Sequence, residues 1–120
     1  MLDHFAIGVR DLAASRAFYE AALAPLGFGV VMERDDRVAL GPPARPIFWL
    51  VNRAPAGGIH VAFQAADRPS VDAFHAAALS AGGSDNGPPG PRLEYHAHYY
   101  GAFALDPDGN NAEAVCHKPG

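Results

Sequence analysis

The 120-residue chain contains an internal repeat, in which residues 60–83 align with residues 4–27 without a gap. Its alanine-rich composition explains some of the matches, but it does not explain the repeated His, Asp, Phe, Leu and Gly. A repeat of this kind predicts two copies of one structural unit, at about residues 1–55 and 56–120, that share a single domain. The identical pairs are His4/His60, Ala6/Ala62, Asp11/Asp67, Ala17/Ala73, Phe18/Phe74, Ala21/Ala77, Ala22/Ala78, Leu23/Leu79 and Gly27/Gly83.

Both units begin with the same two predicted elements. Residues Leu2–Val9 and Gly58–Ala65 alternate between large apolar and small or polar side chains, which indicates a strand with one buried face. An aspartate follows each strand, Asp11 or Asp67, and can cap a helix by accepting hydrogen bonds from its first free amides. Each predicted helix ends at glycine, as helices often do.

Further strands are predicted after each helix, so that both units read as strand–helix–strand–strand–strand. We therefore expect an α+β protein made of two βαβββ modules. In the first unit the predicted strands are Phe28–Glu33, Arg37–Leu40 and Ile47–Val51. In the second unit a weak strand is predicted near Gly83–Asp85 and is followed by a predicted loop at Asn86–Arg92. Two further strands are predicted at Tyr95–Leu105 and Asn110–His117, and a turn at Asp106–Gly109 joins them.

Composition excludes several classes of protein. Hydrophobic residues make up 49% and charged residues 18% of the chain, which is ordinary for a globular domain. The net charge of −4 gives no reason to expect nucleic acid as a partner, and no apolar run is long enough to span a membrane. The N-terminus lacks the pattern of a signal peptide, and Cys116 is the only cysteine. We expect a cytoplasmic protein without an intrachain disulfide.

Three polar residues are candidates for a metal site. Alternation places His4 and His60 on the strand face opposite the large apolar residues, and Glu113 lies between small apolar neighbours, where an unpaired carboxylate would be costly to bury. Two imidazoles and one carboxylate suit zinc, nickel, manganese, cobalt or iron. Taken alone, each histidine could equally be an ordinary polar residue, but their equivalent places in the repeat favour a shared role.

The sequence resembles the glyoxalase/bleomycin resistance protein/extradiol dioxygenase superfamily, also called the vicinal oxygen chelate proteins. The resemblance implies a curved mixed sheet around a central cavity, a homodimer, and a divalent metal ion bound by His4, His60 and Glu113. The motifs that carry it are Leu2-Asp3-His4, Gly8-Val9-Arg10-Asp11 with Phe18-Tyr19, Gly58-Ile59-His60-Val61-Ala62-Phe63, and the closing segment Asp106–Val115.

One departure from the family pattern concerns a fourth ligand. Glyoxalases carry a second glutamate on the last strand of the first unit, but residues 46–53 of this chain contain no carboxylate. The remaining two-histidine, one-carboxylate set resembles that of the extradiol dioxygenases and leaves positions open for substrate and oxygen.

The resemblance predicts a glyoxalase-like, metal-dependent enzyme of the lyase or isomerase type that acts on a small oxygen-rich substrate. An Fe(II) extradiol-type dioxygenase, a non-enzymatic protein that binds small molecules or antibiotics, and a structural module are the alternatives.

Further candidate residues surround the predicted site. His96, His98 and Tyr100 are candidates for proton transfer, although the two histidines could also be exposed loop residues. Trp49, Arg92 and Phe103 are candidates for substrate binding, with core or solvent roles as the alternatives.

Overall fold

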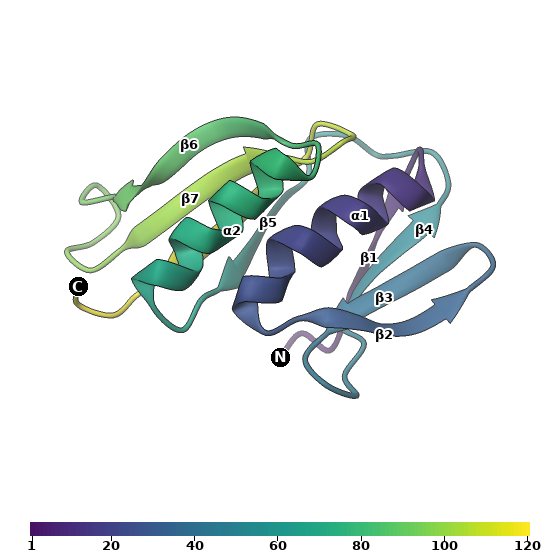
Figure 1. The fold of residues 1–120 in the computed structure, drawn as a ribbon, viewed down its shortest axis with the longest axis horizontal. Helices are drawn as coiled ribbons and strands as arrows, with labels where there is room; N and C mark the ends of the chain where they lie inside the picture. Colours follow the sequence, from purple (N-terminus) through teal and green to yellow (C-terminus); the bar gives the residue numbers. More distant parts are fainter.

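The computed structural model describes residues 1–120 and contains two βαβββ modules, which confirms the predicted α+β fold (Figure 1). The first module consists of β1 (Phe5–Val9), α1 (Leu12–Leu23), a short 3₁₀ helix η1 (Ala24–Leu26), β2 (Gly29–Arg34), β3 (Arg37–Gly41) and β4 (Phe48–Asn52). The second consists of β5 (His60–Gln64), α2 (Arg68–Ser80), β6 (Ser84–Pro91), β7 (Tyr100–Leu105) and β8 (Asn111–Cys116).

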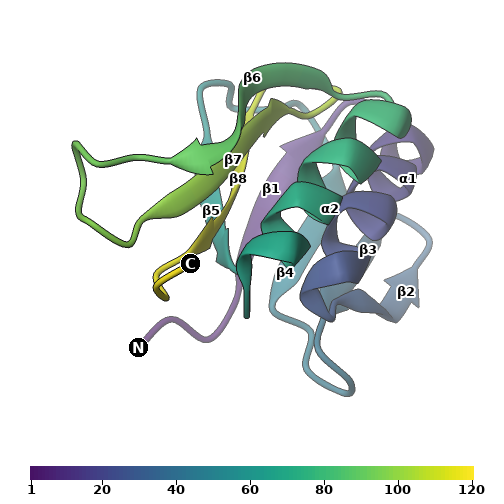
Figure 2. The same ribbon diagram turned by 60° about the vertical axis from the view of Figure 1, so that its left-hand side comes forward.

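Each module forms its own four-stranded mixed sheet, with strand orders β1-β4-β3-β2 and β5-β8-β7-β6. The first strand of each module runs parallel to the last, and the other neighbours are antiparallel. The two helices lie side by side, each against its own sheet (Figures 1 and 2). Both sheets therefore have one face covered by a helix and an opposite face, here called the open face.

Strand alternation separates the core from the open faces. On β1 and β4, Ile7, Val9, Phe48 and Leu50 are buried in a hydrophobic core that both modules share. The ring of Phe48 meets that of Phe63 on β5 at a centroid distance of 5.4 Å. Residues at the intervening strand positions, among them His60, Trp49 and Glu113, point to the open faces.

Both helix starts follow the prediction. The side chain of Asp11 accepts a hydrogen bond from the Ala14 amide, and that of Asp67 accepts from the Ser70 amide. The Ser70 hydroxyl donates to the same Asp67 oxygen, and these bonds lower the pKa of Asp67. The repeated aspartates are therefore helix caps.

The segment predicted as the loop Asn86–Arg92 is instead most of β6, so that prediction is wrong. Three prolines in this strand, Pro88, Pro89 and Pro91, have no amide to donate to a neighbouring strand. They are tolerated because β6 is an edge strand and its pairing with β7 is interrupted by two irregularities. The next strand is shorter than predicted, because residues before Tyr100 form turns.

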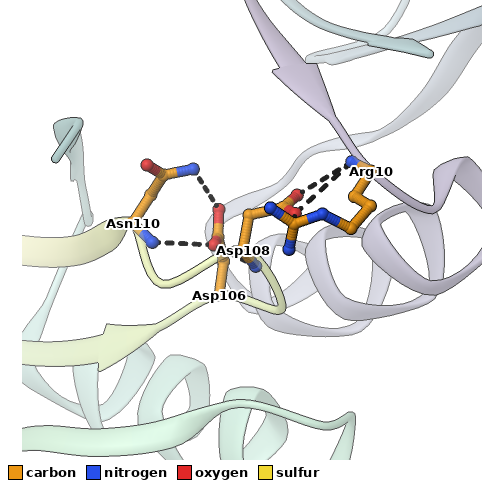
Figure 3. Close-up of polar contacts among 4 residues, drawn as sticks. All are labelled: Arg10, Asp106, Asp108 and Asn110. Atoms are coloured by element: carbon orange, nitrogen blue, oxygen red, sulfur yellow. Dashed lines mark hydrogen bonds and ion pairs between the residues drawn. The ribbon is translucent and has the colours of Figure 1, made fainter. Parts of the chain in front are cut away.

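The closing Asp106-Pro-Asp-Gly turn joins the two modules (Figure 3). The Asp106 carboxylate is 5% exposed and accepts hydrogen bonds from the Tyr19 hydroxyl of α1 (2.6 Å) and the Asn110 side-chain amide (3.1 Å). Its other oxygen accepts from the backbone amides of Asp108 and Asn110, both at 2.9 Å. Asp108 in turn accepts from the Arg10 amide and lies 3.6 Å from its guanidinium. This motif therefore has a structural role at the seam between modules.

Candidate functional site

Glu113 lies at the centre of the open face of the second sheet. In the strand register it is opposite Ala62 on β5 and Phe103 on β7. Its side chain is only 2% exposed, although it does not belong to the hydrophobic core. Small and aromatic neighbours thus hold a carboxylate away from water.

Two side chains contact the Glu113 carboxylate, one at each oxygen. The His60 Nε2 atom lies 2.8 Å from Oε1, and the Tyr99 hydroxyl donates to Oε2. Since an ionised carboxylate can only accept, Nε2 of His60 carries a proton in this arrangement. Burial and the hydrogen bond to Glu113 raise the pKa of Tyr99 well above its usual value. Tyr99 therefore stays protonated and acts as a donor.

A turn before β7 holds Tyr99 in place. Its ring contacts those of Tyr95, His96 and His117 at centroid distances of 4.7, 5.5 and 5.3 Å. The His98 backbone amide donates to His96 Nδ1, so Nε2 of His96 carries the proton that it shares with His117 Nδ1, 2.9 Å away. His96 and His98 are exposed on this turn, and neither forms a hydrogen bond with Glu113.

Tyr100 points to the other side of the second sheet. Its hydroxyl donates to Asp72 on α2 (2.6 Å), and the guanidinium of Arg68 lies over its ring. Tyr100 packs against the core, so the structure does not bring it to Glu113. Tyr99 is the residue that the sequence reasoning missed. Alternation carried back from Phe103 puts Tyr99 on the same face as Phe103, and this is the signal that could have indicated it.

Phe103 and Arg92 lie near Glu113. The Phe103 ring centroid is 6.2 Å from that of His60, and the Arg92 guanidinium lies 5.4 Å from the Phe103 ring centroid. Arg92 also donates to the carbonyls of Pro88 and Gly90 in the proline-rich strand. Phe103 thus forms one side of this site, while Arg92 is largely engaged in stabilising β6.

His4 and Trp49 lie apart from Glu113, on the open face of the first sheet. They border a cavity of about 410 Å³, together with Asp3, Ala6, Arg37 and Pro46. His4 precedes β1 and is exposed, and its Nδ1 lies 2.6 Å from the Asp3 carboxylate. The structure therefore brings His60 and Glu113 together and leaves His4 on the other module.

The chemistry of a divalent metal fits part of this arrangement. An imidazole nitrogen and a carboxylate oxygen are both common metal ligands, and His60 Nε2 and Glu113 Oε1 lie together, 2.8 Å apart. However, no group of three histidine, cysteine or acidic side chains in the chain is placed to hold a metal ion. One chain supplies two of the three predicted ligands at one place.

The Glyoxalase/Bleomycin resistance protein/Dioxygenase superfamily model matches residues 1–114, and the chain belongs to this superfamily. A glyoxalase/bleomycin resistance protein from Albidiferax ferrireducens is similar in structure, with a TM-score of 0.80, 33% identity, and coverage of 96% of this chain and 97% of the other. Neither helix has the length and apolar character needed to cross a membrane. A comparison with curated proteins found no match.

Two more distant structures share the fold. Glyoxalase I from Zea mays gives a TM-score of 0.73 at 23% identity, over 96% of this chain and 45% of the maize chain. Lactoylglutathione lyase from Agrobacterium tumefaciens gives 0.68 at 21% identity, over 94% of this chain and 90% of the other. The predicted resemblance is thus confirmed at the level of superfamily and fold.

Replacing Tyr99 with phenylalanine is expected to destabilise the protein by about 1–3 kcal/mol, because Glu113 Oε2 would lose its donor in a buried position. Chemical denaturation measures the change. The control is Tyr95→Phe, since the Tyr95 hydroxyl makes no hydrogen bond within the chain and Tyr95 is 60% exposed. Equal stability of wild type and Tyr99→Phe would contradict the assigned hydrogen bond.

Proposed function

We propose that the protein is a glyoxalase-like enzyme of the lyase or isomerase type, which acts on a small oxygen-rich substrate chelated to a divalent metal ion. The metal would be held by His60 and Glu113 of one copy and by His4 of a second copy, in a homodimer. Membership of a superfamily that includes the glyoxalases supports the reaction class. The observation that carries the proposal is the buried Glu113 carboxylate beside His60.

The surroundings of Glu113 favour a cation. Its carboxylate is almost fully buried, and no lysine or arginine is paired with it. Burial of a carboxylate without a compensating positive charge is unfavourable, and a divalent ion is one way to compensate it. The His60 side chain is half-exposed, so an imidazole nitrogen is accessible at the same place.

The second copy is needed because His4 lies on the other module. The internal repeat makes the open faces of the two sheets structural counterparts, with Ala6 opposite Trp49 in one and Ala62 opposite Glu113 in the other. A dimer that places the first sheet's open face against the second sheet's open face of its partner would supply His4. The same association would cover surface that so short a chain leaves exposed.

When bound, the ion would polarise vicinal substrate oxygens as a Lewis acid. The chain's own residues would do the remaining work. Phe103 would exclude water beside Glu113, and Tyr99 would keep its carboxylate in one orientation. His96 and His98, on the exposed turn that carries Tyr99, would exchange protons with the substrate.

The strand that carries Trp49 has no carboxylate that could serve as a fourth ligand. This favours a second candidate, an Fe(II)-dependent dioxygenase with a three-ligand site. Oxygen uptake would separate it from a lyase or isomerase, which consumes none. The separation of His4 from Glu113 within one chain favours a third candidate, a protein that binds small molecules without a metal and without turnover.

The test is the metal content of the purified native protein, followed by equilibrium dialysis of the chelator-treated protein against zinc, nickel, manganese, cobalt and iron salts. About one ion per chain is expected, with binding lost in His60→Ala. Gln64→Ala is the matched control, because Gln64 is exposed on the same face of the same strand. Metal-free native protein that takes up no ion, or unchanged binding by His60→Ala, would refute the proposal.

A further inference from the structure

Trp49 occupies the position in the first sheet that Glu113 occupies in the second. Trp49 is paired in register with Ala6 on β1, as Glu113 is paired with Ala62 on β5. Its neighbour on the other side is also an alanine, Ala39 on β3. The two positions directly paired with Trp49 therefore carry no large side chain.

The only tryptophan of the chain has few partners within the structure. Trp49 is half-buried, is not part of the hydrophobic core, and is not among the residues that pack against that core. It has no aromatic or cationic neighbour in stacking contact, and its indole N–H donates no hydrogen bond. A large aromatic side chain that borders a cavity of about 410 Å³ is thus left with a free ring face and a free donor.

The charged groups of this cavity are already paired. Arg37 donates from Nε and Nη2 to both carboxylate oxygens of Asp36, at 3.0 Å each, and this bond lowers the pKa of Asp36. His4 is likewise in contact with Asp3. The cavity therefore offers no unpaired cation for an anionic ligand, and its available contacts are the indole ring and N–H.

We propose that the cavity bordered by Trp49, Ala6 and Arg37 binds a neutral planar aromatic ring, stacked on the indole, with an oxygen that accepts a hydrogen bond from the indole N–H. Aromatic rings stack favourably in offset or edge-to-face geometry, and a free indole N–H favours an acceptor. The inference rests on the proposed function in that this ring is taken to belong to the substrate. The proposed substrate is therefore an aromatic compound.

The experiment uses phenol and cyclohexanol, which share a hydroxyl and a six-membered ring and differ in aromaticity. Both are titrated into ¹⁵N-labelled full-length protein in the presence of a chelator, and the single indole N–H signal is followed by NMR. Phenol is expected to shift this signal in a saturable way, and cyclohexanol at least about threefold more weakly. Calorimetry should show phenol binding to Trp49→Ala weakened by roughly three- to tenfold.

Two further variants control for folding and for a general apolar effect. Trp49→Phe keeps an aromatic face and should retain part of the affinity for phenol. Leu79→Ala removes an exposed apolar side chain from α2 and should bind phenol as the wild type does. A folded Trp49→Ala protein that binds phenol with unchanged affinity would overturn the proposal.

Other outcomes also decide the matter. Equal shifts with phenol and cyclohexanol would refute aromatic recognition, and so would an indole signal that phenol does not move at any protein concentration. Because the chelator removes metal, the result does not depend on the metal site. Phenol binding by a protein that, in the separate dialysis test, neither contains metal in its native form nor takes up any would refute the proposed function and leave this site standing.

Discussion

Replacing Asp106 with alanine is expected to lower the free energy of unfolding by about 3–5 kcal/mol, a large fraction of the stability of a domain of this size. Four donors converge on its buried carboxylate, from Tyr19, Asp108 and twice from Asn110. Without it, these donors stay buried without an acceptor, which costs more than the bonds contribute. Urea denaturation followed by circular dichroism measures the loss.

Tyr19→Phe is the matched control for Asp106→Ala. It removes only one of the four donors and leaves the ring packed between Phe18 and Phe48, so a loss of about 1–1.5 kcal/mol is expected. In the double variant the two effects should not add, because both changes break the same hydrogen bond. Full additivity, or a loss below 1 kcal/mol for Asp106→Ala, would contradict the proposed role of the turn as a junction.

Mixing His4→Ala protein with Glu113→Gln protein is expected to restore metal binding that neither variant has alone. Each variant alone should bind metal at least about 100-fold more weakly than the wild type, because every site in its homodimer lacks one ligand. In a mixed dimer, one site combines the His4 of the Glu113→Gln chain with the His60 and Glu113 of the His4→Ala chain. That site is intact, while the other lacks two ligands.

The amount restored follows from subunit statistics. If chains exchange freely at equal concentrations, half of the dimers are mixed and each holds one intact site of two, so about a quarter of all sites recover. The measurement is equilibrium dialysis after partial unfolding and joint refolding. Two variants refolded separately and then combined without exchange provide the control. Full binding by His4→Ala alone, or no recovery after verified exchange, would rule out a shared site.

Much of the fold could be predicted from the sequence because the repeat is strong. The paired histidines, aspartates and glycines indicated two equivalent units, and strand alternation placed Glu113 away from the helix side. The strand registers show that Trp49 on β4 is paired with Ala6 as Glu113 on β8 is paired with Ala62, so these two residues are counterparts in the two units. These features depend on local periodicity, which a single sequence displays directly.

Other features depend on contacts that periodicity does not display. The prolines of β6 indicated a loop, but β6 is an edge strand with irregular pairing to β7, where missing amide donors are tolerated. The contact between Tyr99 and Glu113 depends on how the turn before β7 folds, because Tyr99 lies outside the strand. The distance between His4 and His60 depends on how the two modules pack against each other, and alternation within one strand carries no information about that.

The proline-rich edge strand β6 also affects the tendency of the protein to aggregate at high concentration. An exposed sheet edge normally offers a row of free amides and carbonyls to which a strand from another molecule can add, and this is a common start of aggregation. Pro88, Pro89 and Pro91 remove donors from β6, and Arg92 occupies the carbonyls of Pro88 and Gly90. Edge-to-edge addition of a strand from another molecule at β6 is therefore disfavoured.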